Sequence, residues 1–230
     1  MARLIKLSPH SLSLFLDCPR CFWLRYNQRV KRPEAISPSV PRGLDYVLKG
    51  YFDYHRKQGM VPELSGLIEG QLLEDEDLVS QMRKTSFGIE LGQNIWFRGA
   101  LDDAVRLEDG SIVPLDNKTK GFPPKGVHWS YEVQLASYVF ILKKKGIKTK
   151  NFGYLAYWFL DHKNLDPSRP FLFQVKVERV EVDPTKIARL IDEAVKTLKG
   201  PLPKKGCRLD QKGKKQDCPF CDYREWIFAP

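Results

Sequence analysis

Residues 113–121 read VPLDNKTKG, an apolar run that ends with a carboxylate and an ammonium two positions apart and then a glycine. Alternate residues of a β-strand share a face, so Asp116 and Lys118 project together while Leu115 and Asn117 point the other way. The apolar start predicts a largely buried strand. The alternative is an exposed ion pair, which would contribute almost nothing to stability.

A β-hairpin is expected to contain this strand. Residues 94–120 form two alternating runs joined by Glu-Asp-Gly at 108–110, which is a typical turn sequence. The hairpin brings Asp102 or Asp103 close to Asp116. Two carboxylates on neighbouring strands repel each other unless a cation lies between them, and Mg²⁺ prefers oxygen ligands. We therefore expect a divalent-metal site in which Lys118 orients a water and stabilises charge on a phosphate.

The rest of the pattern predicts helices packed on a mixed sheet, which makes an α/β fold. Residues 28–42 hold three prolines and read as a loop, and the 230-residue length suits one main core. Helices are expected from Ser8 with an interruption at Pro19, at about 43–58, at about 74–84, at 129–145 with Gly146 as cap, and after Asp183; strands are expected at about 152–160 and 170–180.

The charge balance favours a polyanionic partner. The chain carries 38 Lys and Arg against 28 Asp and Glu, a net charge of +10, which makes nucleic acid the leading candidate. The alternative is a well-solvated basic surface. Apolar runs are shorter than the roughly 20 residues that cross a bilayer, and no signal peptide is convincing, so we expect a cytoplasmic protein with no membrane partner.

Three motifs resemble those of the PD-(D/E)XK nuclease superfamily, in particular its RecB-like and CRISPR-adaptation exonuclease branch. They are RGALDDAV at 98–105, VPLDNKTKG at 113–121 and YEVQLASYVF at 131–140. The N-terminal CPR at 18–20 is similar to that branch as well. The resemblance implies a restriction-endonuclease-like mixed sheet flanked by helices, and metal-dependent hydrolysis of DNA, exonuclease-like, at single strands or ends.

The resemblance also implies which residues form the site. Its GxxD motif runs from Gly99 to Asp102, its DxK motif is Asp116 and Lys118, and its QxxxY motif is Gln134 and Tyr138. The main-chain carbonyl of Asn117 is implied as a further ligand of Mg²⁺ or Mn²⁺. A helicase or integrase-type protein is a candidate partner. The alternative function is a nucleic-acid-binding module whose catalysis is weak or lost.

One helix departs from the family pattern. Many members place a His after a Gly on an early helix as an extra metal ligand, whereas residues 41–56 read PRGLDYVLKGYFDYHR. No His follows Gly43 at that spacing. Asp45 is the nearest substitute ligand, and His55 lies further along the same helix. Weak metal binding is expected if neither contributes.

Five cysteines form a separate set: two in CPRC at 18–21, two in CPFC at 218–221, and Cys207. Paired CxxC spacing is typical of intracellular metal sites, and thiolates bind either Zn²⁺ or an iron-sulfur cluster. The resemblance implies a 4Fe-4S cluster on Cys18 or Cys21 with Cys207, Cys218 and Cys221. Zinc on the two CxxC pairs, with Cys207 spare, and five unliganded thiols are the alternatives.

A shared cysteine site would clip the chain ends together. We therefore expect a nuclease-like domain at 1–200 and a metal- or cluster-binding tail at 201–230 that packs on the N-terminal helix. Cations track phosphates and aromatic rings stack on bases. Lys120, Lys125 and Trp129, which follow the DxK strand, are the candidate nucleic-acid contacts.

Overall fold

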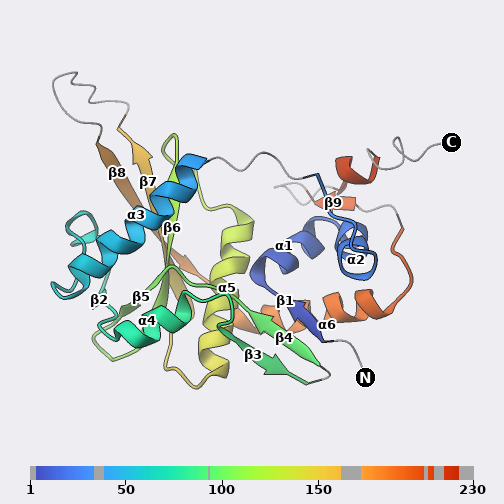
Figure 1. The fold of residues 1–230 in the computed structure, drawn as a ribbon, viewed down its shortest axis with the longest axis horizontal. Coiled ribbons are helices and arrows are strands. Elements are labelled where there is room, and N and C mark those ends of the chain that lie inside the picture. The colour runs from blue at the N-terminus through green and yellow to red at the C-terminus, as the bar shows by residue number, and fades with distance from the viewer. Residues whose placement is uncertain are drawn as a thin grey trace.

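The computed structural model describes residues 4–33, 39–92, 94–161, 172–204, 207–209 and 215–222. Its centre is a five-stranded sheet in the order β2-β5-β6-β7-β8 (Figure 1). Neighbouring strands are antiparallel except β6 and β7, which run parallel. The predicted mixed sheet is confirmed. The strands are β2 (Gln71–Leu72), β5 (Asp103–Arg106), β6 (Ile112–Lys120), β7 (Phe152–Leu160) and β8 (Phe173–Glu181).

Helices cover both faces of this sheet, as Figure 1 shows. On one face, Phe52 of α3 packs with Tyr154 and Trp158 of β7. On the other face, Leu155 and Tyr157 of the same strand belong to the core built with α5 and α6. The alternation explains why nearly the whole of β7 is apolar, since both of its faces are buried. The helices are α3 (Ser39–Arg56), α5 (Trp129–Lys144) and α6 (Pro184–Lys199).

A smaller sheet corrects the predicted hairpin. The alternating run at 94–107 is not one strand, because its first part pairs in the order β1-β4-β3 and only its second part, β5, joins the large sheet. Between the two parts, the backbone N–H groups of Gly99 and Leu101 donate to the carbonyls of Phe87 and Met82 instead of continuing a ladder. The strands are β1 (Ile5–Leu7), β3 (Gly88–Leu91) and β4 (Ile95–Arg98), and α4 (Glu76–Met82) directly precedes β3.

The helix ends follow the sequence signals. The Ser8 hydroxyl accepts a hydrogen bond from the N–H of Ser11 at the start of α1 (Pro9–Asp17). The helical conformation is interrupted at Cys18, which is extended, before α2 (Pro19–Asn27) begins. Asp183 caps α6, and Gly146 follows α5 with a φ of +77°. Such a left-handed residue satisfies the last helical carbonyls. These predictions are confirmed.

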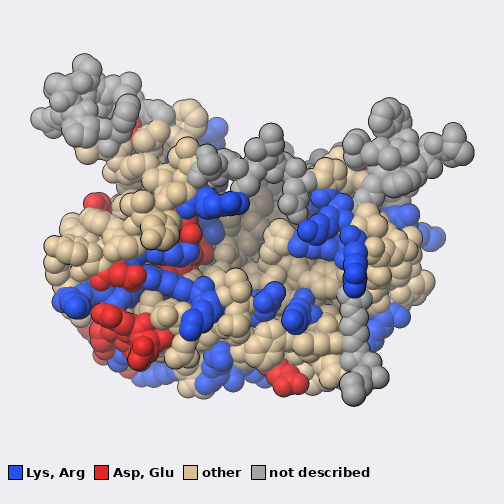
Figure 2. Space-filling model, in the orientation of Figure 1, with Lys and Arg blue, Asp and Glu red and all other residues tan. Residues whose placement is uncertain are grey.

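Strand β1 and the described part of the tail lie on the same side of the molecule as α1 and α2 (Figure 1). In the tail, β9 (Cys207–Leu209) and β10 (Lys215–Asp217) form an antiparallel pair. In the part of the chain that the structure describes, every helix is too short or too polar to cross a membrane. Figure 2 shows Lys and Arg over much of one face, whereas acidic side chains gather around the start of α4, where residues 74–77 read EDED.

Candidate active site and cysteine cluster

Strand β6 presents Asp116 and Lys118 toward α5. The Asp116 carboxylate is 1% exposed and pairs with the Lys118 ammonium. Lys118 Nζ also donates to Gln134 Oε1 at 2.9 Å. The predicted shared face of Asp116 and Lys118 is therefore present, and burial excludes the alternative of an exposed ion pair.

Helix α5 links this pair to the loop before β5. Gln134 Nε2 donates to the Tyr138 hydroxyl at 2.8 Å, and that hydroxyl donates to the carbonyl of Ala100 at 2.6 Å. Gln134 and Tyr138 are one helical turn apart, so they lie on one face of α5. Tyr138 is 3% exposed. Both side chains are engaged in holding Lys118 and the Gly99–Asp102 loop in place.

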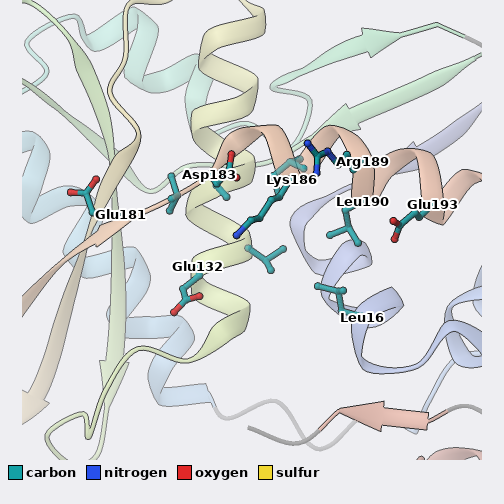
Figure 3. Close-up of a pocket in the computed structure, with 12 residues that line it drawn as sticks. Leu16, Glu132, Glu181, Asp183, Lys186, Arg189, Leu190 and Glu193 are labelled. Carbon is teal, nitrogen blue, oxygen red and sulfur yellow. The ribbon is translucent and has the colours of Figure 1, made fainter. Parts of the chain in front are cut away.

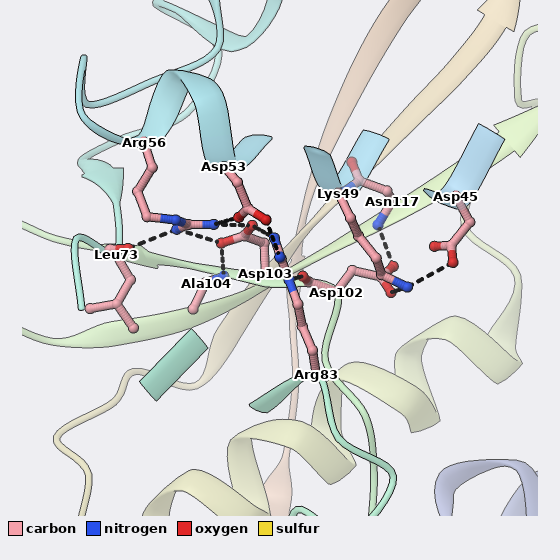
Figure 4. Close-up of polar contacts among 10 residues, drawn as sticks. All are labelled: Asp45, Lys49, Asp53, Arg56, Leu73, Arg83, Asp102, Asp103, Ala104 and Asn117. Atoms are coloured by element: carbon pink, nitrogen blue, oxygen red, sulfur yellow. Dashed lines mark hydrogen bonds and ion pairs between the residues drawn. The ribbon is translucent and has the colours of Figure 1, made fainter. Parts of the chain in front are cut away.

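Asp102, and not Asp103, faces Asp116. The backbone N–H of Asn117 donates to Asp102 Oδ2 at 3.0 Å, which ties this carboxylate to β6. Asp103 points to the opposite side, where its Oδ2 lies 2.7 Å from Arg56 Nη2 and 2.9 Å from Arg83 Nη2 (Figure 4). The structure thus resolves the choice that the hairpin pattern left open.

A buried charge network supports the backbone at Asp102. Arg83 Nε donates to the carbonyl of Asp102 at 2.8 Å while its guanidinium bonds Asp103 and Asp53. Arg56, 3% exposed, completes the network by donating to the Leu73 carbonyl at 2.7 Å. Sequence reasoning missed both arginines, because a charged residue on an amphipathic helix usually faces solvent.

Helix α3 brings Asp45 and Lys49 to the same site (Figure 4). Lys49 Nζ lies 2.7 Å from Asp45 Oδ2 and 4.0 Å from Asp102 Oδ1. Asp45 was predicted here, whereas Lys49 was not. His55 lies in the last turn of α3, where its Nδ1 is 2.9 Å from Gln58 Oε1. It packs against Tyr51, as a residue at a helix end commonly does.

The two facing carboxylates are electrostatically strained. Burial, and then the charge of Asp116, raise the pKa of Asp102 to about 7. The hydrogen bond from the Asn117 N–H and the charges of Lys118 and Lys49 lower this pKa, but by less. Burial also raises the pKa of Asp116, against its partner Lys118. A divalent cation would relieve this repulsion, and two carboxylates are the ligands that Mg²⁺ uses beside water and substrate phosphate. The donor set fits the predicted ion.

The predicted nucleic-acid contacts flank this site. Lys120 is exposed at the end of β6, and its Nζ lies 5.5 Å from the centre of the Tyr131 ring. Lys118 Nζ lies over the same ring, 4.7 Å from its centre. Lys125 is exposed in the loop that follows, and Trp129 begins α5 with its ring 5.4 Å from that of His128. These side chains therefore line the β6–α5 connection.

Four buried cysteines from the two ends of the chain meet beside α1 and α2. Cys18 Sγ is 3.7 Å from Cys221 Sγ, and Cys21 Sγ is 3.7 Å from both Cys218 Sγ and Cys221 Sγ. The four sulfur atoms lie within 4.8 Å of one another. This is a four-thiolate metal site, suited to zinc or to an iron-sulfur cluster.

Both N-terminal cysteines belong to this cluster, whereas the resemblance implied only one of them together with Cys207. The side chain of Cys207 lies outside the described residues. The Arg32 guanidinium lies 3.6 Å from Cys218 Sγ and 4.5 Å from the Phe220 ring. Hydrogen bonding from Cys18, with a further contribution from Arg32, lowers the pKa of Cys21 to about 5, whereas the same hydrogen bond raises the pKa of Cys18, so Cys21 is the thiolate of this pair.

A separate hollow of about 410 Å³ lies between α1, α5 and α6 (Figure 3). Its floor is apolar, and none of Asp102, Asp116 and Lys118 lines it. Four carboxylates line it: Glu132, Glu181, Asp183 and Glu193. Two cations, Lys186 and Arg189, line it as well, so the lining carries a net charge of −2, which does not favour a nucleic-acid backbone.

Comparison with known proteins agrees with the geometry of the carboxylate site. Residues 45–226 match the PD-(D/E)XK nuclease superfamily. The chain belongs to this superfamily. The match runs through the hairpin, α5 and α6 into the cysteine tail, and a nuclease superfamily implies a nucleic-acid substrate. No curated protein matches the chain.

Two solved structures resemble this PD-(D/E)XK chain over most of its length. One is described as the crystal structure of SSO0001, with 17% identity and a TM-score of 0.43, covering 88% of this chain and 81% of that one. The other is an alkaline exonuclease (LHK-Exo) from Laribacter hongkongensis, with 13% identity and a TM-score of 0.40, covering 86% and 88%.

Proposed function

We propose that this chain is a metal-dependent nuclease that hydrolyses phosphodiester bonds in DNA, exonuclease-like, at single strands or ends. The observation that carries the proposal is the placement of Lys118, which is held between Asp116 and Gln134 while a second carboxylate, Asp102, faces the same space. Superfamily membership and the net charge of +10 support a nucleic-acid substrate.

Each residue has a distinct role in this proposal. Asp102 and Asp116 would hold Mg²⁺ or Mn²⁺, with the main-chain carbonyl of Asn117 as a further candidate ligand, whereas Asp45, the substitute ligand expected from the sequence, pairs with Lys49. The bound ion supplies Lewis-acid charge at the phosphoryl oxygens. Lys118 orients the attacking water and stabilises negative charge that develops on the phosphate.

The surrounding residues position this machinery and the strand. Gln134 and Tyr138 are positioning residues, because their contacts go to Lys118 and to the Ala100 carbonyl. Lys120 and Lys125 would contact phosphates, and Trp129 would stack on a base. Within the superfamily, the motif order and the N-terminal CPR favour the RecB-like and CRISPR-adaptation branch, for which a helicase or integrase-type protein is the candidate partner.

Cleavage of end-labelled DNA tests the proposal. Single- and double-stranded substrates are incubated with Mn²⁺ or Mg²⁺ and the native protein, Asp116→Ala or Lys118→Ala, with Asp77→Asn on exposed α4 as the matched control. We expect metal-dependent cleavage by the native protein and the control only. Binding of DNA by the native protein with no cleavage under any of these conditions would support the alternative, a catalytically inactive binding module.

For the cysteine cluster we propose a structural Zn²⁺ on Cys18, Cys21, Cys218 and Cys221. A tetrahedral site with Zn–S bonds of about 2.3 Å places its sulfur atoms about 3.8 Å apart. Three of the six Sγ–Sγ distances are 3.7 Å, which fits this value, and all four sulfur atoms lie within 4.8 Å of one another. A 4Fe-4S cluster places iron and sulfide atoms between the thiolates and needs wider spacing.

Zinc at this position would fasten the tail, residues 201–230, to the first two helices of a nuclease-like domain, residues 1–200. Elemental analysis of protein purified without oxygen distinguishes the two metals. One zinc per chain in colourless protein supports the proposal. Brown protein with stoichiometric iron and sulfide would overturn it in favour of the cluster implied by the family resemblance.

A further inference from the structure

Lys49 is the charged group at the candidate active site that the proposed mechanism does not use. It projects from α3 toward Asp102 and the β5–β6 hairpin (Figure 4). Its ammonium lies 2.7 Å from Asp45 Oδ2 and 4.0 Å from Asp102 Oδ1. Each of the two lysines at the site therefore has its own carboxylate partners.

The contact within α3 does not by itself account for this arrangement. Asp45 and Lys49 are an i,i+4 pair with side chains 48% and 35% exposed, and such pairs are worth about 0.3–0.5 kcal/mol. The contact with Asp102 is different, because that carboxylate is 22% exposed and is also tied to β6 through the Asn117 N–H. The attraction between a cation and this partly buried carboxylate is screened less by water than an attraction at the surface.

The positive charge of Lys49 reaches both carboxylates of the hairpin. The Lys49 ammonium lies 4.0 Å from Asp102 Oδ1, and its charge also acts on the buried Asp116. The charge of Asp45 acts on Asp116 in the opposite direction. Among the described residues, the four cysteines are the single group of three or more His, Cys, Asp or Glu side chains that suits one ion. Asp45, turned to Lys49, does not complete a three-carboxylate site.

We infer that Lys49 is a resident cation of this site: its ammonium takes the position between Asp45 and Asp102 that a second divalent ion would take. The site then holds one divalent ion, at Asp102 and Asp116, and excludes a second. Lys49 is a positioning residue in this account, because it acts through Asp102. The inference rests on the proposed function only in that Asp102 and Asp116 must bind the first ion.

The number and affinity of bound ions test this role without measuring cleavage. Full-length protein with its cysteine site intact is titrated with Mn²⁺ by calorimetry and by electron paramagnetic resonance, at pH 8 and without DNA. The variants are Lys49→Gln, which removes the charge, and Lys49→Arg, which keeps it. Lys57→Gln, an exposed lysine just after α3, is the matched control, and Asp116→Asn removes a ligand of the first ion.

We expect one Mn²⁺ per chain for the native protein, Lys49→Arg and Lys57→Gln. Lys49→Gln should bind a second ion or bind the first about tenfold more tightly, because a unit charge near a divalent ion has been removed. Unchanged stoichiometry and affinity in Lys49→Gln would overturn the inference, as would a loss of binding in that variant, which would show that Lys49 only holds Asp102 in place.

The Asp116→Asn variant distinguishes a failure of the inference about Lys49 from a failure of the proposed metal site. If the native protein binds Mn²⁺ and Asp116→Asn does not, the proposed metal site stands, whatever Lys49→Gln does. If the native protein binds no more Mn²⁺ than Asp116→Asn, the proposed metal site fails, and the inference about Lys49 fails with it.

Discussion

Lys118 Nζ and Gln134 Oε1 lie 2.9 Å apart, so a residue of α5 sets the direction of the ammonium that β6 supplies. Within the strand, Lys118 pairs with Asp116. Gln134 is held in turn by the Tyr138 hydroxyl at 2.8 Å. The orientation of Lys118 therefore depends both on its own strand and on the helix that follows, from a residue 16 positions further along the chain.

This contact predicts a catalytic defect without a binding defect. Gln134→Leu should lower the single-turnover rate of DNA cleavage by about 10–100-fold, because a misplaced catalytic group loses its effective concentration at the reacting atom. Affinity for DNA in EDTA should stay within about twofold. Glu132→Gln, on the exposed side of the same helix, is the control and should keep the native rate. An equal loss of affinity in Gln134→Leu would contradict the assignment.

Gly99 predicts a defect in stability. A Cβ atom at Gly99 would lie 2.8 Å from Cε1 of the Tyr138 ring, which is closer than atoms of a packed core tolerate. Gly99→Ala should therefore lower the free energy of unfolding by about 1–3 kcal/mol, measured by urea titration. Gly92→Ala is the control, since no atom lies within 4 Å of its added Cβ. Equal effects of the two substitutions would show that the ring of Tyr138 imposes no constraint.

The cysteine cluster predicts which thiols hold metal. Cys21→Ser and Cys218→Ser should lose the metal, and the fold should lose about 5 kcal/mol, because the ion closes a loop of 197 residues. Cys207→Ser should keep full metal content and the native melting temperature. The reverse result for Cys207, measured by elemental analysis and thermal unfolding, would favour the ligand set implied by the family resemblance.

The sequence predicted those parts of the site that depend on local periodicity. A period of two placed Asp116 and Lys118 on one face, and a period of 3.6 placed Gln134 above Tyr138. It did not predict that the run through Gly99 divides between two sheets, because alternation looks the same on both sides of the division. The choice of Asp102 over Asp103 depended on the partners of each, which come from elsewhere in the chain.

Those partners explain why Lys49, Arg56 and Arg83 were missed. Lys49 and Arg56 lie on α3 and Arg83 directly follows α4, where a charged side chain is ordinarily solvated. Only the packing of α3 and α4 against the β5–β6 hairpin turns each of them toward a carboxylate. The cysteine pairs were easier to interpret, because CxxC spacing by itself is typical of metal ligands. Even so, the membership of Cys18 and Cys21 in one cluster required the position of α2.

The neighbouring residues Asp102 and Asp103 predict opposite effects on stability. The pKa of Asp102 is raised from 3.8 to about 7 in the folded protein, so between these values the folded state binds more protons than the unfolded state. The free energy of unfolding contributed by this group therefore falls as pH rises from about 4 to about 7. Above pH 7, without divalent ions, the buried charge of Asp102 costs about 4 kcal/mol.

Asp102→Asn should remove that cost, raise the melting temperature at pH 8 and flatten the pH dependence between 4 and 7. Mn²⁺ should stabilise the native protein at pH 8 and should not stabilise the variant. Asp103→Asn is the contrast: it removes the partner of the buried Arg56 and should destabilise the fold by about 3–5 kcal/mol. Thermal unfolding of the three proteins at pH 5 and pH 8 in EDTA checks these expectations. A lower melting temperature for Asp102→Asn at pH 8 would show that Asp102 stabilises the fold as a charged group, and that its two lysines outweigh its burial.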